Sequence, residues 1–288
     1  MDTRPFRSVL YIPGSKERAL EKATTLAADA IIFDLEDAVA IDEKARARVL
    51  LAETLQSTDY GQRAKLVRIN ALSSEWGAAD LDVIGSIKPE AILLPKVDTP
   101  AHVEALARLL DARPETADTR IWAMIESPKA VLNAQTIACA PRMAGFIMGT
   151  NDLAKDVGCR SRPDRQQLLT ALQLPLIAAK AAGIVAVDGV YNAFRDEAGL
   201  RTECEQGRDM GFDGKTLIHP LQLPVANEVF SPSEAEVTLA KRQIEAFDAA
   251  TARGEGVAVL DGMIVENLHI VTAKQTLAKA QAFAELTE

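Results

Sequence analysis

Short apolar segments recur along the chain, and a stretch with apolar positions at helical spacing follows most of them. Each apolar segment is rich in β-branched residues and too short for a buried helix, which is typical of a strand covered on both faces. Their starts lie roughly 22 to 39 residues apart, which is the length of one strand and one helix. The predicted strands are residues 8–13, 30–37, 65–70, 91–96, 121–127, 145–152, 184–189 and 215–220.

Helical patterns fill the intervals between these strands, as at residues 15–28, 43–54, 100–112, 166–182 and 195–210. Eight strand–helix units in about 220 residues fit a (β/α)8 barrel better than a doubly wound sheet, which usually has fewer strands. The doubly wound alternative also lacks a glycine-rich fingerprint after the first strand. We therefore predict an α/β protein built on a (β/α)8 TIM barrel.

The pattern changes after the eighth predicted strand. A long alanine-rich helix is predicted at residues 232–254, then a short strand at 257–260, a turn at Asp261-Gly262 and a helix at about 271–286. Because the barrel is already complete, we expect a catalytic barrel domain over residues 1–230 and a C-terminal helical lid segment over residues 231–288. This segment either caps the barrel or packs on a neighbouring subunit.

Composition narrows the class of protein. The 288 residues are 48% hydrophobic and 25% charged, as in an ordinary globular protein. The net charge of -9 argues against a nucleic-acid partner, which needs a basic face, but leaves room for a phosphorylated cofactor. Three cysteines without paired spacing predict free thiols in a reducing cytosol. No apolar run approaches ~18 residues and the N-terminus lacks an apolar signal core, so we expect a soluble cytoplasmic protein with no membrane partner.

Two carboxylates follow apolar segments on successive predicted strands. In a TIM barrel the active-site groups lie at the C-terminal ends of the strands, which is where Glu126 and Asp152 are expected. Mg²⁺ is bound through one or two protein carboxylates together with water and substrate oxygens. Because no His or Cys cluster has transition-metal spacing, zinc is disfavoured. We predict a Mg²⁺ site at this pair.

Each strand-end residue also has a purely structural interpretation. Asp152 is placed to cap the helix that follows it. For Glu126 that role falls more naturally to Ser127, which precedes a proline, so Glu126 is left without a structural role. His219 is interpreted equally well as a packed or a catalytic histidine, and Asp188 as a structural residue of the barrel rim.

A buried arginine and three acidic residues lie on neighbouring predicted strands. Arg68 lies within an apolar strand and needs an anionic partner, because an unpaired buried charge is severely costly. That partner is either a structural carboxylate or the carboxylate or enolate of a substrate, which the planar guanidinium suits. Asp34, Glu36 and Asp37 follow an apolar segment directly, which makes full solvation of this triplet less favourable than a place in the site.

Six motifs occur in a familiar order. They are RSVLYIPG at 7–14, IFDLEDAV at 32–39, VRIN at 67–70, IES at 125–127, GTNDL at 149–153 and GKTLIHP at 214–220. Together they cover nearly the whole chain and resemble the citrate lyase β-subunit-like family of the HpcH/HpaI aldolase superfamily, which includes malyl-CoA and citramalyl-CoA lyases. The resemblance implies a (β/α)8 barrel in a homotrimer or homohexamer, with the C-terminal segment covering the site of a neighbouring subunit.

The resemblance also implies roles for individual residues. Glu126 and Asp152 look like the Mg²⁺ ligands, and Arg68 looks like the group that holds the substrate carbonyl. Metal-bound waters would be held by Asp34, Glu36 and Asp37. The α-keto acid carboxylate would lie beside Glu126 and contact the backbone of Gly149, Thr150 and Asn151. The phosphates of CoA would be contacted by Lys16 and Arg18.

The activity implied is Mg²⁺-dependent retro-Claisen cleavage of a 3-hydroxyacyl-CoA, such as malyl-CoA or citramalyl-CoA, to an α-keto acid and an acyl-CoA. One alternative is a thioesterase, in which the same site directs water at the thioester of malyl-CoA. Another is a subunit that works only within a citrate lyase complex, on an acyl-carrier partner.

The chain departs from the family pattern in its C-terminal segment. Many relatives carry an aspartate in a Gly-Lys-Met-Ile-Asp-type stretch, where it is thought to be the acid/base for the acetyl carbon. Alignment on Gly262 places Glu266 at that position. The extra methylene moves the carboxylate by one bond, and a misplacement of ~1 Å can cost ~100-fold in rate. Glu266 is either a solvated turn charge or, as we predict, the acid/base of a neighbouring subunit's site.

Overall fold

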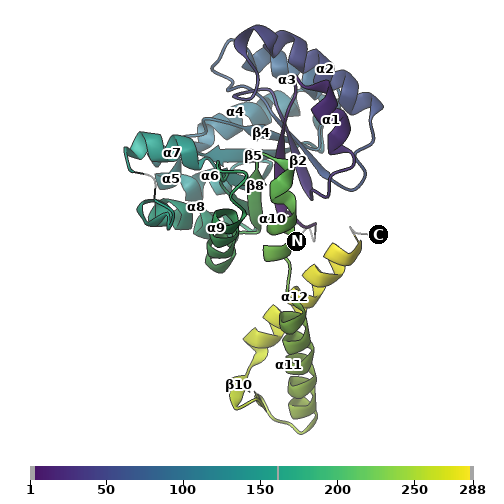
Figure 1. Ribbon diagram of the computed structural model, residues 1–288, viewed down its shortest axis with the longest axis vertical. Coiled ribbons are helices and arrows are strands. Elements are labelled where there is room, and N and C mark those ends of the chain that lie inside the picture. Colours follow the sequence, from purple (N-terminus) through teal and green to yellow (C-terminus); the bar gives the residue numbers. More distant parts are fainter. Residues whose placement is uncertain (1–3, 161, 286–288) are drawn as a thin grey trace. The chain divides into compact units, whose positions relative to one another are not determined.

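Eight parallel strands close into a barrel in the computed structural model, which describes residues 4–160 and 162–285 (Figure 1). Each strand pairs with the next in sequence, and the eighth pairs with the first. The prediction of a (β/α)8 TIM barrel is therefore confirmed, and the doubly wound alternative is excluded. The strands are β1 Ser8–Pro13, β2 Ala30–Asp34, β3 Ala64–Arg68, β4 Ala91–Leu94, β5 Arg120–Ile125, β6 Met143–Met148, β7 Val185–Asp188 and β8 Gly214–Leu217.

All eight predicted strands are present, but most end earlier than predicted. β2 was predicted to run to residue 37 and ends at Asp34, and β6 was predicted to run to residue 152 and ends at Met148. The acidic residues beyond these ends therefore lie outside the sheet, Glu36 and Asp37 in the loop after β2 and Asp152 in helix α7. In register, Asp34 of β2 is paired with Arg68 of β3.

Helices surround the barrel strands (Figure 1). The barrel interior between the strands is filled by alternate apolar side chains, such as those of Ile32, Leu66 and Met124. Trp122 takes part in this layer, and Gly145 faces it because a Cβ at position 145 would lie 2.6 Å from the Trp122 ring. The helices are α1 Glu17–Ala23, α2 Lys44–Ser57, α3 Gly77–Gly85, α4 Pro100–Asp111, α5 Pro128–Leu132, α6 Ala134–Ala138, α7 Thr150–Val157, α8 Leu169–Ala182, α9 Glu197–Met210 and α10 Leu223–Val229.

The segment after Asn227 forms a second unit, separate from the barrel unit Phe6–Asn227. It contains helices α11 (Glu234–Ala252) and α12 (Asn267–Glu285), which pack against each other, and a hairpin of β9 (Ala258–Leu260) and β10 (Met263–Val265). Its small core includes Ala250, Ala258, Val265 and Ile270. That this unit acts as a lid stays a prediction.

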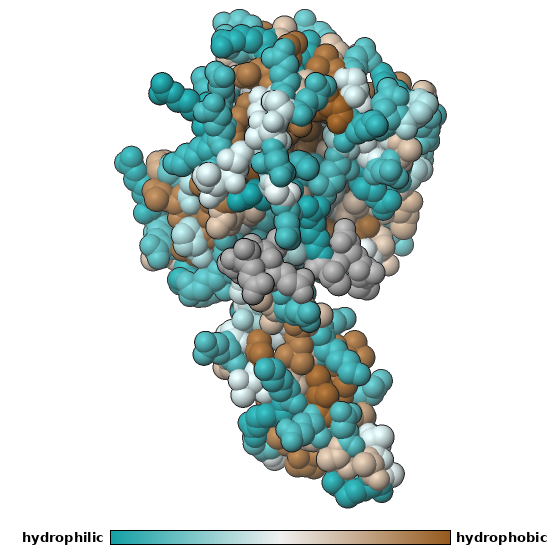
Figure 2. All heavy atoms as spheres, turned by 90° about the vertical axis from the view of Figure 1, so that its right-hand side faces the viewer, coloured by the Kyte–Doolittle hydropathy of each residue, from teal (hydrophilic) through white to brown (hydrophobic). Residues whose placement is uncertain are grey.

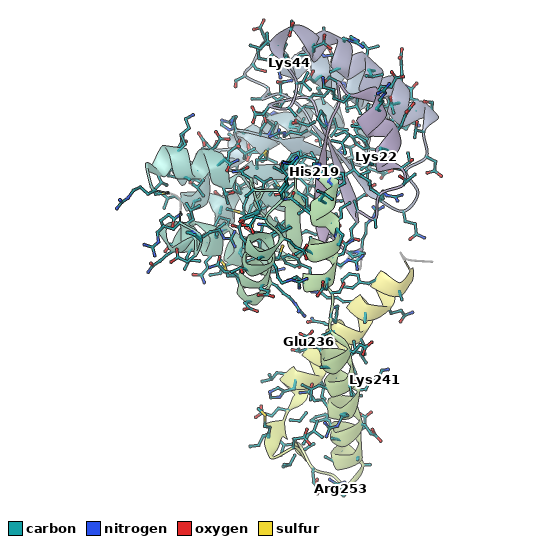
Figure 3. The ribbon with its side chains drawn as sticks, viewed as in Figure 1. Lys22, Lys44, His219, Glu236, Lys241 and Arg253 are labelled. Atoms are coloured by element: carbon teal, nitrogen blue, oxygen red, sulfur yellow. The ribbon has the colours of Figure 1, made fainter. Side chains whose placement is uncertain are left out.

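Two features of the second unit follow from its sequence. Helix α11 begins with a capping box, in which Ser233 accepts from the Glu236 N–H (3.2 Å) and the Glu236 carboxylate accepts from the Ser233 N–H (2.7 Å) (Figure 3). The predicted turn is confirmed, since Asp261 and Gly262 both have positive φ (51° and 79°), as a two-residue hairpin turn requires. Strand β10 was not predicted, and α12 begins at Asn267, four residues before the predicted start.

Among the described residues, no helix combines the length and the apolar character that a membrane crossing demands.

Candidate active site

Glu126 lies immediately after β5, with its side chain in the barrel mouth. Ser127 caps the following helix, accepting a hydrogen bond from the Ala130 N–H (3.0 Å), and Pro128 takes the first helical position. The predicted division of roles is therefore confirmed: Ser127 is the cap. The Glu126 side chain is free of that duty and is only 3% exposed.

The Glu126 carboxylate is incompletely satisfied. Its Oε1 accepts a hydrogen bond from the Lys96 backbone N–H (2.6 Å), whereas its buried Oε2 has no hydrogen-bond partner among the described residues. Burial raises the pKa of Glu126 above its ordinary value, although the Lys96 hydrogen bond and charge act against this. A buried carboxylate oxygen without a donor is costly, and it is satisfied when a proton or a cation binds.

Gly149 leaves the space that this carboxylate occupies. A Cβ at position 149 would lie 2.4 Å from the Glu126 Cβ and 3.0 Å from Oε2, distances that only a displaced glutamate would relieve. Gly149 also donates its N–H to the Ile125 carbonyl (2.9 Å), which fixes the two chain segments against each other. The glycine is thus required by close approach to Glu126.

Asp152 is not at a strand end, contrary to the prediction, but in the first turn of α7. It does not cap that helix either, because the N-cap residue is Gly149 and no side-chain cap bond is present. The alternative in which Asp152 is a structural cap is therefore wrong. Its side chain is 37% exposed and lines a cavity of about 280 Å³ at the barrel mouth that Glu126 also lines.

Lys96 joins the two carboxylates, a relationship that the sequence analysis missed. Its Nζ lies 3.5 Å from Glu126 Oε1 and 3.5 Å from Asp152 Oδ2. Burial alone would lower the pKa of Lys96, but the charges of Glu126, Glu36 and Asp152 outweigh it and raise the pKa. Lys96 also has a positive φ of 56°, a left-handed conformation that costs a non-glycine residue of order 1 kcal/mol and that clusters at functional sites.

The acidic pair meets the requirements of a hard cation. A cationic group already lies between the two carboxylates, and one buried oxygen lacks a partner. No group of three His, Cys, Asp or Glu side chains in the described part of the chain could hold a metal unaided. Mg²⁺ is usually held by one or two protein carboxylates, and water and substrate oxygens fill its remaining coordination positions. The residues therefore fit Mg²⁺ better than a metal that needs a closed protein cage.

Arg68 is bound by a structural carboxylate, the first of the two predicted alternatives. Its Nε and Nη2 donate to the two oxygens of Asp34 (2.7 and 2.6 Å), and its Nη1 lies 2.8 Å from Glu36 Oε2 and 3.6 Å from Asp37 Oδ2. The guanidinium also lies over the Tyr11 ring at 5.0 Å. The triplet of acidic residues thus surrounds Arg68, and its predicted role toward metal-bound waters stays a prediction, as does the contact of Arg68 with substrate.

Glu36 is an additional buried acidic group beside an arginine that is already paired with Asp34. Asp34 already neutralises Arg68, and burial raises the pKa of Glu36 to about 8 despite the guanidinium. Its loop is braced by Lys44 (labelled in Figure 3), whose Nζ donates to the Leu35 and Glu36 carbonyls (3.0 and 2.8 Å). Glu36 is therefore a candidate proton-carrying group near neutral pH.

The start of α7 presents backbone N–H groups beside the acidic pair. Thr150 is buried and packs closely against Gly189: a Cβ added at position 189 would lie 2.5 Å from Thr150 Oγ1. Asn151 exchanges two side-chain hydrogen bonds with Asn192 (3.3 and 2.8 Å), which ties the first turn of α7 to the loop after β7. The orphan N–H groups of a helix start suit an anion, which is consistent with the predicted carboxylate contact.

Three of the predicted residues are not among those that line this cavity. Lys16 and Arg18 are exposed at the start of α1, where Lys16 makes no side-chain cap bond. Glu266 is exposed in the second unit, and its N–H donates to His269 Nδ1 (2.9 Å). Their roles in CoA binding and proton transfer stay predictions.

Two ambiguous strand-end residues have structural roles. His219 (labelled in Figure 3) stacks on Phe194 with ring centroids 4.4 Å apart and caps a short helical turn through Nδ1, which accepts from the Leu221 N–H. Asp188 is buried between Arg165 and Lys215, and these cations hold its pKa below the ordinary value although burial alone would raise it. Asp188 is therefore a structural charge, as interpreted from the sequence.

A family model described as HpcH/HpaI aldolase/citrate lyase matches residues 7–220. A (3S)-malyl-CoA thioesterase from Cereibacter sphaeroides is 63% identical over 280 residues, covering 97% of this chain and 96% of that protein. A citrate lyase subunit beta from Leuconostoc mesenteroides is 37% identical over 282 residues, covering 96% of this chain and 93% of that protein.

Among solved structures, the chain is similar to the CitE protein of Mycobacterium tuberculosis in complex with magnesium, acetoacetate and coenzyme A. The TM-score is 0.82 at 29% identity, covering 97% of this chain and 99% of that one. A citrate lyase beta subunit from the same organism, complexed with oxaloacetate and magnesium, has a TM-score of 0.70 at 32% identity, covering 81% of this chain and 100% of that one.

Proposed function

The chain belongs to the HpcH/HpaI aldolase/citrate lyase family, and we propose that its barrel is a Mg²⁺-dependent carbon–carbon lyase that acts on a CoA thioester. The substrate is malyl-CoA, citramalyl-CoA or a similar 3-hydroxyacyl-CoA, which retro-Claisen cleavage converts to an α-keto acid and an acyl-CoA. The observation that carries the proposal is the pair Glu126 and Asp152. The Lys96 ammonium lies between the two carboxylates, and the buried Oε2 of Glu126 has no hydrogen-bond partner among the described residues.

Glu126 and Asp152 would hold the Mg²⁺ ion. When bound, the ion supplies Lewis-acid polarisation of substrate oxygens and a template for their orientation. The magnesium in the solved CitE complexes supports this choice of cofactor. The N–H groups of Thr150 and Asn151 in the first turn of α7 would orient the substrate carboxylate, whereas the N–H of Gly149, the N-cap residue, already donates to the Ile125 carbonyl.

Arg68 would stabilise the negative charge that develops on the substrate oxygen. Its guanidinium is already fixed by Asp34, Glu36 and the Tyr11 ring, so little reorganisation is needed during reaction. Loss of one such preorganised donor typically costs ~3 kcal/mol of transition-state stabilisation.

Two further parts of the proposal concern substrate binding and proton transfer. Lys16 and Arg18, exposed at the start of α1, would contact the phosphates of CoA. Glu266 of a neighbouring subunit would move the proton at the acetyl carbon, as a general acid/base must lie within hydrogen-bond reach of that proton.

Hydrolysis of the thioester is a second candidate reaction, and the name of the 63% identical Cereibacter sphaeroides relative favours it. The same acidic pair and Arg68 would polarise the thioester carbonyl, the water oxygen would add to the carbonyl carbon, and the C–S bond would break to release malate and the CoA thiol. Glu266, where many relatives have aspartate, is the residue on which the balance between cleavage and hydrolysis would depend. Action within a citrate lyase complex is less well supported, because the subunits with that name are 36–37% identical.

Assembly into a homotrimer or homohexamer would bring Glu266 to a neighbouring barrel. The second unit exposes large apolar side chains, as Figure 2 shows, and such a surface marks interaction sites. These are Leu239, Val257, Val259, Met263, Ile264, Leu268 and Val271.

Product analysis of the purified protein with Mg²⁺ and (3S)-malyl-CoA tests the proposal. Glyoxylate and acetyl-CoA in equal amounts identify the lyase, whereas malate and free CoA identify the thioesterase. Both activities should disappear with a chelator, return with Mg²⁺, and be absent in Glu126→Gln and Asp152→Asn, which keep the barrel folded by circular dichroism. Asp156→Asn, one helical turn beyond Asp152, should stay within a few-fold of the wild type. The proposal would be overturned if neither malyl-CoA nor citramalyl-CoA gave any product of cleavage (acetyl-CoA with glyoxylate or pyruvate, respectively) or of hydrolysis (CoA with malate or citramalate, respectively).

A further inference from the structure

Lys96 makes an unusual double contact with one carboxylate. Its backbone N–H donates to Glu126 Oε1 (2.6 Å), and its side-chain Nζ lies 3.5 Å from the same oxygen. The same Nζ lies 3.5 Å from Asp152 Oδ2. The ammonium therefore lies where a cation shared by both carboxylates has to lie.

The two contacts of Lys96 differ in how easily they can be broken. The backbone N–H belongs to the segment directly after β4, whose last residues are buried, and it stays in place when the side chain moves. The Lys96 side chain is 47% exposed, so its ammonium reaches water without any unpacking of the barrel. Glu126, by contrast, is 3% exposed and cannot move to find another partner.

Charge determines what happens when a divalent cation arrives. The two carboxylates carry two negative charges, and the ammonium neutralises one of them. A dication held by the same carboxylates would be repelled by an ammonium at this distance in a partly buried site. The exposed side chain is the part that can withdraw, whereas the backbone hydrogen bond keeps Glu126 oriented.

We propose that Lys96 is a positioning residue that substitutes for the metal: its ammonium holds Glu126 and Asp152 together in the ion-free protein and is displaced when the divalent ion binds. This inference rests on the proposed function, because it takes the acidic pair as the metal site. By this inference, Lys96 lowers the metal affinity but keeps the two carboxylates in place before the ion binds.

The consequence is a competition between Lys96 and the ion. Removal of the ammonium removes the competitor, so the affinity for the ion should rise. A lysine that merely supported the local structure would give the opposite result, because its loss would disorder the carboxylates and weaken binding. The direction of the change therefore separates the two roles.

Isothermal titration of metal-stripped full-length protein with Mg²⁺, repeated with Mn²⁺, tests the proposal. Lys96→Met should bind at least about tenfold more tightly than the wild type, and a tenfold change corresponds to about 1.4 kcal/mol. Lys96→Arg, which keeps the charge, should bind like the wild type. Lys155→Met is the matched control, because Lys155 lines the same cavity and the structure shows no ion pair between it and either carboxylate.

Thermal unfolding gives a second readout that does not depend on turnover. Without metal, Lys96→Met should melt below the wild type, since two carboxylates lose their shared counter-ion, and saturating Mg²⁺ should raise its Tm by more than it raises that of the wild type. Unchanged or weaker metal binding in Lys96→Met overturns the inference, as does an equal gain in Lys155→Met. If the wild type also binds no divalent ion, the metal site of the proposed function fails together with the inference; if the wild type binds, only the inference fails.

Discussion

Arg68 and Asp34 are register partners on the adjacent strands β3 and β2, and the guanidinium of one donates two hydrogen bonds to the carboxylate of the other (2.7 and 2.6 Å). Asp34 is the last residue of β2 and Arg68 the last residue of β3, so the pairing of the two strands fixes the position of the guanidinium. This arrangement leaves Nη1 as the donor nearest Glu36 (2.8 Å) and orients the arginine at the mouth of the barrel.

Replacement of Arg68 by lysine should be nearly as damaging as replacement by alanine. A lysine is a point charge that cannot satisfy both Asp34 oxygens in the geometry of the guanidinium. We expect kcat/KM to fall at least ~100-fold in both variants, in line with loss of a preorganised donor. Arg142→Lys is the control, because Arg142 pairs with Asp111 just before β6, at the opposite end of the barrel strands from the site. A lysine variant that keeps most of its kcat/KM would show that only the charge of Arg68 matters.

A methyl group at position 149 should disable the site. In Gly149→Ala the new Cβ would lie 2.4 Å from the Glu126 Cβ, so Glu126 must shift by a fraction of an ångström or more. A shift near 1 Å costs ~100-fold in rate, and overpacking costs about 1–3 kcal/mol of stability. In the control Gly158→Ala, at the other end of α7, the new Cβ meets no atom within 4 Å, so the only cost is the backbone strain of a φ of 71°. Equal activity in the two variants would contradict the role given to Gly149.

Glu36 makes the stability of the ion-free barrel pH-dependent. Burial raises its pKa from 4.5 to about 8, so the folded protein retains a proton that the unfolded chain has lost. The resulting stabilisation is complete below pH 4.5 and is lost as the pH rises through about 8. The loss is on the order of a few kcal/mol, at ~1.4 kcal/mol per pKa unit. Denaturant unfolding of metal-free protein between pH 5 and pH 9 should show this decline in the wild type and a flatter profile in Glu36→Gln. Parallel profiles would mean that Glu36 is ionised throughout.

Glu266→Gln should abolish exchange of the acetyl-CoA methyl protons with solvent. A glutamine keeps the size of the side chain but cannot accept and return a proton. Glu255→Gln, in the loop before β9, is the matched control and should exchange like the wild type. The measurement is deuterium incorporation into acetyl-CoA by mass spectrometry. Undiminished exchange in Glu266→Gln, or an oligomer whose second units lie far from every Glu126–Asp152 pair, would refute the assignment.

The sequence predicts the barrel well because each strand is an apolar run with its own local signal. It also predicts that Glu126 does not cap the helix that follows β5, because Ser127 and Pro128 are better suited to the helix start. The structure confirms that Ser127 is the cap. The ends of the strands were less predictable. Asp152 follows its apolar run by only four residues, but α7 begins at Thr150, and hydrophobicity alone does not mark that change.

Pairwise relationships between distant segments could not be predicted from local patterns. The double contact of Lys96 with Glu126 depends on a positive φ at Lys96, and Pro95-Lys96 carries no signal for that conformation. The Arg68–Asp34 pair depends on the register of β2 against β3, and the sequence of the two strands does not specify that register by itself. Strand β10 had a usable signal, because Asp-Gly between apolar residues is a strong hairpin indicator.

The location of a bound divalent ion decides whether Glu126 and Asp152 form the metal site. Crystals of the full-length protein grown with Mn²⁺ in place of Mg²⁺ should give one strong anomalous peak at the barrel mouth. We predict that this peak lies within ~2.2 Å of carboxylate oxygens of both Glu126 and Asp152, with the Lys96 ammonium withdrawn from its place between them. A fully loaded protein whose only peak lies elsewhere, with Lys96 still between the two carboxylates, would contradict it.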